Sequence, residues 1–181
     1  MSSSRSKTTS SIGFLTVREH GELGLLGGYL VINALGRPLE FHCTMPVKPN
    51  RAQEILYGNT LRPFLYGEQI GQTLVSKSKS APVLICTDVE PALATRDFCE
   101  CPMVLVVGRS EATGEAVGPT SSSSRLRSFQ LAGHELAVDA AHERDRQQIM
   151  EKWPQLDAHL DLSEPFGRIR EALEEAQKNA K

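Results

Sequence analysis

The stretch LLGGYLVINALGRPLEFHCTM (residues 25–45) contains two apolar runs that are joined by a short turn. The runs cover residues 25–33 and 38–45, and Gly36 between them offers a position where a positive φ angle costs little. A further apolar run, at residues 12–19, comes before them. The three runs together predict a meander of antiparallel strands.

The third run alternates between apolar and polar side chains. Leu39, Phe41 and Cys43 fall on one face of an extended chain, and polar residues take the positions between them. This alternation predicts that the face with Leu39, Phe41 and Cys43 packs on a core and that the opposite face is polar.

A helical region and two further strands are expected after the meander. Residues 50–57 and 60–75 predict two helices, because Gly58 and Pro63 disfavour a single unbroken one. Residues 82–87 and 102–107 are short and continuously apolar, which is typical of parallel strands covered on both faces. The order predicts an α/β fold: a three-strand meander, then helix, strand, helix and strand, with helices packed on a mixed sheet.

The chain divides into four parts by composition. They are a polar, disordered tail (1–11), the main α/β domain (12–107), a flexible loop rich in serine, glycine and proline (108–125), and a C-terminal part (126–181). The C-terminal part predicts a hairpin followed by helices at residues 140–153 and 163–179, packed on the same domain.

Composition narrows the functional classes. A length of 181 residues and a hydrophobic content of 40% are typical of a globular domain. The net charge of −2 gives no sign of the strongly basic surface that binds nucleic acid. No apolar run approaches the roughly 18 residues that span a bilayer. Four cysteines without framework spacing favour free thiols. We therefore expect a soluble, cytoplasmic protein that does not bind membranes.

Four segments carry a resemblance to a known family. They are GGYLVINALGRPLEF (27–41), NRAQE (50–54), LICTDVE (84–90) and AGHELAVDAAHERD (132–145). Together with the order of strands, they resemble the ribonuclease H-like fold, chiefly over residues 12–107. The resemblance implies a metal-dependent nuclease that uses magnesium, with Asp88 at the end of its strand as a metal ligand and with Asp145 near the end of the chain.

The carboxylate set that the resemblance implies is incomplete. Two-metal hydrolysis needs several carboxylates that converge on adjacent ions. The family's first strand carries an aspartate, whereas the matching position here falls near Val17, and Glu19 fits only with a shift of register. Glu54 is displaced by one residue, which turns a helical side chain by about 100°. The alternative catalytic set is therefore Asp88, Glu54, Glu19 and Asp145.

Asp88 allows two interpretations. It follows the apolar run 82–87 directly, and Pro91 comes soon after it, so it is suited to cap a turn. An acid at the carboxyl end of a buried strand also lies where open α/β sheets bind ligands.

Two other groups of residues are candidate binding sites. Lys48 and Arg51 flank the start of the first helix, where a phosphate or another anion is favoured. Cys99 and Cys101 flank Glu100 and form the only close pair of thiols, which leaves a metal or redox site as the alternative to buried thiols.

The sequence predicts a binding or assembly module without an evident catalytic site and without a cofactor. The helix at residues 163–179 has one apolar stripe, which predicts docking on its own domain, on a protein partner or on a second copy. The alternative function is the metal-dependent, ribonuclease H-like nuclease with magnesium.

Overall fold

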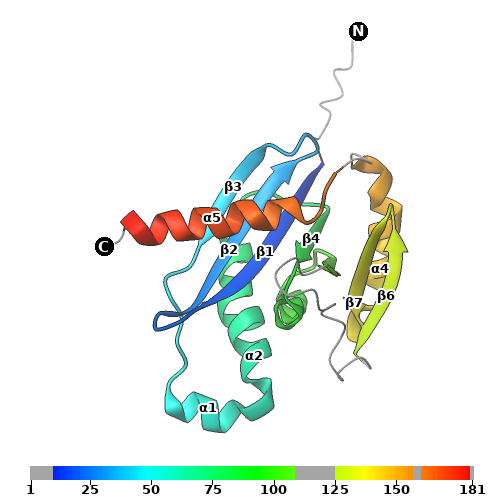
Figure 1. Cartoon of the computed structure of the whole chain (residues 1–181). Coiled ribbons are helices and arrows are strands. Elements are labelled where there is room, and N and C mark those ends of the chain that lie inside the picture. Colours follow the sequence, from blue (N-terminus) through cyan, green and yellow to red (C-terminus); the bar gives the residue numbers. More distant parts are fainter. Residues whose placement is uncertain (1–9, 109–124, 157–159, 180–181) are drawn as a thin grey trace.

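The computed structural model describes residues 10–108, 125–156 and 160–179, and these form a mixed α+β fold around one seven-stranded sheet (Figure 1). The order across the sheet is β3-β2-β1-β4-β5-β7-β6. The strands are β1 (Ser11–His20), β2 (Gly24–Asn33), β3 (Pro38–Cys43), β4 (Leu84–Thr87), β5 (Met103–Val106), β6 (Leu126–Leu131) and β7 (His134–Asp139).

The predicted meander is confirmed. β1 pairs with β2 and β2 pairs with β3, both antiparallel. The turn between β2 and β3 forms because the Asn33 side chain accepts hydrogen bonds from the backbone N–H groups of Leu35 and Arg37. Gly36 has a φ angle of 75°, the left-handed conformation in which glycine is favoured.

The predicted parallel strands are confirmed as well. β4 runs parallel to β1, and β5 runs parallel to β4. The hairpin β6–β7 continues the same sheet, because β7 pairs antiparallel with β5. Of the predicted tail at residues 1–11, residues 1–9 lie outside the described residues. Ser11 is the first residue of β1, so the strand starts one residue earlier than predicted. Most of the predicted loop, at residues 109–124, lies outside the described residues.

Helical segments connect the strands and cover the sheet. Between β3 and β4 lie α1 (Arg51–Tyr57), the 3₁₀ turn η1 (Gly58–Thr60), α2 (Leu61–Pro63), the π-helical η2 (Phe64–Gln72) and α3 (Thr73–Lys77). Between β4 and β5 lies the 3₁₀ segment η3 (Glu90–Phe98). After the hairpin come η4 (Ala140–His142), α4 (Arg144–Lys152), η5 (Trp153–Gln155) and α5 (Glu164–Asn179). No helix in these described ranges is long and apolar enough to cross a membrane.

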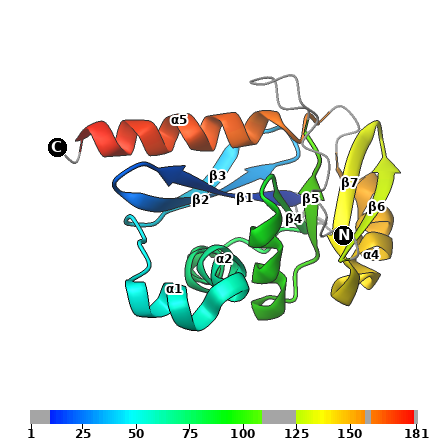
Figure 2. The same ribbon diagram turned by 60° about the horizontal axis from the view of Figure 1, so that its bottom comes forward.

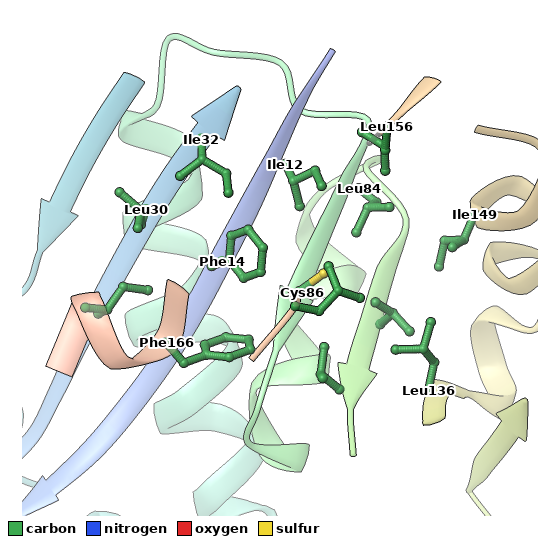
Figure 3. Packing of buried hydrophobic residues seen from close by; sticks show 14 of the residues in the cluster. Ile12, Phe14, Leu30, Ile32, Leu84, Cys86, Leu136, Ile149, Leu156 and Phe166 are labelled. Carbon is green, nitrogen blue, oxygen red and sulfur yellow. The ribbon is translucent and has the colours of Figure 1, made fainter. Parts of the chain in front are cut away.

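The sheet lies between two helical layers (Figure 2). On one face, α5 packs on β1 and β2, and the ring of Phe166 meets the ring of Phe14 edge-on at 5.4 Å. Figure 3 shows Cys86 and Leu84 in the same cluster. On the other face, η2 and η3 cover a second cluster that includes Tyr29. Alternate residues of the central strands therefore serve two cores.

Two adjacent glycines of β2 allow both helical layers to approach the sheet. A Cβ atom on Gly27 would overlap the side chain of Ile70 in η2. A Cβ atom on Gly28 would overlap the side chain of Ile169 in α5. Because neighbouring residues in a strand point to opposite faces, the two glycines admit one helix each.

One prediction about β3 is wrong. Leu39 and Phe41 are 50% and 39% exposed, and Cys43 is exposed, so their face is not packed on a core. Phe41 pairs with Leu30, whose side chain is in the α5-side cluster, which places this row on the face covered by α5. The row stays exposed because α5 lies over β1 and β2, while β3 is the edge strand.

Candidate functional site

Asp88 lies at the carboxyl end of β4, beside the middle of β1. The parallel register pairs Leu15 with Thr87, so the next residues, Thr16 and Asp88, come level with each other. The helix α5, which packs on β1 and β2, brings the guanidinium of Arg170 onto the Asp88 carboxylate, and the two form an ion pair. Three segments of the chain therefore meet at this acid.

Burial governs the electrostatics of Asp88. Its side chain is 15% exposed, and desolvation raises the pKa of its carboxyl above the ordinary value. The hydroxyl of Thr16 and then the charge of Arg170 oppose this increase without cancelling it. Thr16 Oγ1 and Asp88 Oδ1 are both buried and have no partner of good hydrogen-bond geometry among the described residues. The effect of Thr16 on the pKa thus reflects proximity, because the geometry of a full hydrogen bond is not reached.

The rim of the site carries further charges. Arg18, two residues after Thr16 on β1, forms a 3.5 Å ion pair with Glu174 of α5. Arg18 also lowers the pKa of Asp88 slightly. The carboxylate thus has one guanidinium in contact and a second nearby, and both favour its charged form.

Glu19 and Glu54, two members of the alternative catalytic set, lie elsewhere. Glu19 accepts a hydrogen bond from the Tyr66 hydroxyl at 3.1 Å and lies 3.7 Å from Arg62. Glu54 is on α1 and binds Arg51 at 3.1 Å on the surface of the same helix. Neither carboxylate contacts Asp88.

Asp145, the fourth member, is at the other end of the parallel strands. It is 1% exposed and binds Arg96 of η3 through two hydrogen bonds, of 2.8 and 3.1 Å. It also accepts the backbone N–H of Met103, the first residue of β5. Asp88 follows the last residue of β4, so the two acids lie at opposite ends of neighbouring strands. A cavity of about 570 Å³ adjoins Asp145 and the turn at residues 140–144.

The structure therefore assigns each acid of the alternative set to a different arginine. The pairs are Asp88 with Arg170, Glu19 with Arg62, Glu54 with Arg51 and Asp145 with Arg96. Within the described part of the chain, no three His, Cys, Asp or Glu side chains come together as metal ligands. The convergence that two-metal chemistry requires is not formed by these four acids.

The predicted anion site is not assembled either. Lys48 lies 3.5 Å from the backbone carbonyl of Glu22, and Arg51 is bound to Glu54. The N–H of Gln53 is already capped by the Asn50 side chain. The two cations point to separate partners, and the start of α1 offers little to an anion.

The thiols of Cys99 and Cys101 each contact a backbone carbonyl group. Cys101 is 3.3 Å from the carbonyl oxygen of Pro82, and Cys99 is 3.8 Å from that of Cys101. Burial raises the pKa of Cys101 to about 12 and also raises the pKa values of Cys99 and Cys86. Such thiols are poor nucleophiles and poor metal ligands at neutral pH.

An exposed apolar surface lies along the segment that follows β3. Met45 is 82% exposed, and Ile55 and Leu56 of α1 are 65% and 81% exposed. No residue of α1 is buried. The helix is held to the rest of the chain by the ring of Tyr57, which stacks on Phe64 at 4.2 Å. Exposed apolar side chains gathered on one segment are typical of an interaction surface.

Sequence reasoning identified Asp88 but missed Thr16 and Arg170. The parallel pairing of β1 and β4 would have indicated Thr16, since it fixes which residue of β1 comes level with Asp88. Nothing in the sequence around Arg170 indicates its partner, which is 82 residues away. No protein-family model matches the chain, and no curated protein sequence matches it significantly.

Proposed function

We propose that this protein is a binding or assembly module built on a ribonuclease H-like sheet. The observation that carries the proposal is the ion pair between Arg170 and Asp88. A guanidinium is bound to the carboxylate at the carboxyl end of the central strand β4, where ligands of open α/β folds gather. The other three acids are each bound to an arginine of their own, so the acids serve the structure of the domain.

Three further features support the proposal. The antiparallel meander followed by two parallel strands is the order that the family resemblance implies. The surface of α1 and Met45 offers apolar side chains to a partner. All four cysteines are free, which suits a reducing compartment, and we infer that the protein works in the cytoplasm.

The competing function is the magnesium-dependent nuclease, and metal binding separates the two. Thermal unfolding is measured with magnesium, manganese and a chelator for the wild type, Asp88→Asn and Arg170→Met. An ion that binds the folded state raises its free energy of unfolding by RT ln(1 + [L]/Kd), and the melting temperature rises with it. We expect no metal-dependent shift in the wild type and no hydrolysis of RNA or DNA. A shift with magnesium that disappears in Asp88→Asn, together with hydrolysis, would overturn the proposal.

Partner binding is tested on α1. A benzophenone amino acid is placed at Leu56 of the full chain, and the matched control carries it at Met150, which is also exposed but lies on α4. We expect irradiation in the cells of origin to give a discrete adduct from position 56 and none of the same mass from position 150. Equal labelling at both positions would show contact by chance encounter and would count against the module.

A further inference from the structure

The free edge of β3 has the pattern of a strand that pairs with itself. β3 ends the sheet, and the backbone N–H of Thr44 binds the carbonyl oxygen of Gly27 in β2. Alternate residues of an antiparallel strand turn their backbone groups to the same neighbour. Glu40 and His42 therefore face β2, whereas Phe41 and Cys43 turn their N–H and C=O groups outward.

The two edges of the sheet differ in chemistry. The side chains exposed on β6, at the other edge, are the polar Arg127, Ser128 and Gln130. On β3 the exposed residues after Pro38 are Leu39, Phe41 and Cys43. Proteins protect edge strands with charges, prolines and bulges. β3 carries a proline at its start, a register shift at Leu39 and the charge of Glu40, but Phe41 and Cys43, which turn their backbone groups outward, are uncharged.

The residues on either side of Phe41 have complementary charges when a second copy of β3 pairs antiparallel with the first. Glu40 precedes Phe41 and His42 follows it, so an antiparallel copy centred on Phe41 places each Glu40 opposite a His42. Ser80 and His42 donate hydrogen bonds to Glu40 and lower the pKa of its carboxyl to about 2, which keeps Glu40 negatively charged. A register centred on Glu40 would oppose two carboxylates, and one centred on His42 would oppose two imidazoles.

We propose that β3 is a self-association site, at which β3 of a second copy pairs antiparallel with it about a two-fold axis through Phe41. The two sheets then become one, and the apolar row of each copy faces the same side. That side also carries α5, whose C-terminal end extends beyond the strands (Figure 1, Figure 2). This inference rests on the proposed function, assembly, and names the partner as a second copy of the chain.

Contact through α5 itself is not needed for this assembly. The apolar stripe of α5 is buried on the chain's own sheet, with Phe166, Ile169 and Leu173 at most 4% exposed. The stripe that was expected to dock on its own domain, on a partner or on a second copy thus docks on its own domain, and the proposed contact with a second copy uses the edge strand instead. The interface is isologous, as in most two-fold dimers, because Phe41 meets its symmetry mate and each contact of Glu40 with His42 is matched by one of His42 with Glu40.

The first test is the mass of the protein in solution. Sedimentation velocity over a wide range of concentration is compared for the wild type, Phe41→Lys and the matched control Leu56→Lys, whose side chain is also exposed. We expect a concentration-dependent dimer for the wild type and for Leu56→Lys, and a monomer for Phe41→Lys. A wild type that stays monomeric throughout would overturn the inference, as would a dimer that only Leu56→Lys dissociates.

The second test fixes the register. In the Cys43→Ser background, Phe41→Cys places two thiols opposite each other, at the Cα separation of about 5.5 Å found in a hydrogen-bonded pair, which suits a disulfide. Oxidation with diamide is expected to give a covalent dimer, and Leu56→Cys in the same background to give none. No link from Phe41→Cys, or equal linking from both, would overturn the pairing. Either failure leaves the proposed function standing, because that is tested by metal binding and by contacts of α1.

Discussion

Arg170 of α5 and Asp88, which directly follows β4, are 82 residues apart in the chain and form an ion pair at the carboxyl end of this central strand. The carboxylate is largely buried, while the guanidinium is 40% exposed. The acid at the carboxyl end of the strand is thus neutralised by the last helix of the fold. Docking of α5 on the sheet therefore also brings the positive charge that pairs with Asp88.

Removing Arg170 is expected to destabilise the protein. Arg170→Met leaves Asp88 buried without its counter-charge, at a cost between the roughly 1 kcal/mol of an exposed pair and the 3–5 kcal/mol of a buried one. Urea unfolding measures the loss. The double variant Arg170→Met/Asp88→Asn is expected to recover part of it, because the unpaired charge is then gone. Equal stability of the wild type and the single variant would show that the pair contributes nothing.

The loss in Arg170→Met depends on pH with a defined sign. The pKa of Asp88 is raised in the folded protein, so the folded state holds this proton more tightly than the unfolded chain does. Stability that is present at pH values below the ordinary aspartate pKa of about 4 is lost as the pH rises through the folded value. Without Arg170 the folded pKa rises further, and the deficit against the wild type grows from acidic to neutral pH. Urea unfolding across this range checks the trend, and a deficit that shrinks with pH would contradict it.

The buried pair of Asp145 and Arg96 is expected to matter more than exposed pairs. Asp145→Asn breaks a bidentate contact at a residue that is 1% exposed, and we expect a loss of roughly 3–5 kcal/mol. The matched control is Glu54→Gln, which breaks the exposed pair with Arg51 and is expected to cost at most about 0.5 kcal/mol. Urea unfolding of both variants makes the comparison. Similar losses would show that burial does not set the strength of these pairs.

Gly28 is expected to tolerate no side chain. Gly28→Ala introduces a Cβ atom that overlaps Ile169, and the strain of overpacking is about 1–3 kcal/mol. Gly167→Ala is the control on α5, since its Cβ atom meets no atom within 4 Å and alanine favours the helix by about 1 kcal/mol. Thermal unfolding should move down for the first variant and up for the second. A neutral Gly28→Ala would mean that α5 shifts freely on the sheet.

Alkylation of the thiols is expected to follow exposure. At neutral pH, a pKa of about 12 leaves Cys101 with roughly a thousandfold less thiolate than an ordinary cysteine. Cys43 is exposed on β3 and should react first with iodoacetamide, and buried Cys86 last. Peptide mass spectrometry gives the order. Faster labelling of Cys99 or Cys101 than of Cys43 would indicate an activated thiol pair.

Local patterns in the sequence predict the elements well, because each rests on nearby residues. The alternation in β3 and the turn at Gly36 are properties of a few residues, and the continuous apolar run of β4 is another. The same alternation correctly groups Leu39, Phe41 and Cys43 on one face. The alternation does not show whether a helix covers that face, and in the structure α5 packs on β1 and β2 and leaves Leu39 and Phe41 exposed.

The candidate site depends on contacts between segments that are far apart in the chain, and local sequence patterns do not predict such contacts. Asp88 is marked by its place after an apolar strand, so it could be predicted. Arg170 could not, because its partner is set by the path of α5 across the sheet. Glu19 and Asp145 were grouped with Asp88 by resemblance, but the fold binds them to Arg62 and Arg96 at separate places.

The missing side chain at position 28 bears on how such a site can change. Ile169 touches the strand at Gly28, and the next residue of α5 is Arg170. The height of the helix above the sheet therefore also sets the reach of the guanidinium. We expect a single methyl group at position 28, which overlaps Ile169, to lift this part of α5 and to weaken the ion pair with Asp88 without altering any charged residue. A mutation at Gly28 on β2 would in this way free a carboxylate that follows β4, two strands away. The size of the residue at position 28 therefore controls whether Asp88 is available to bind another group.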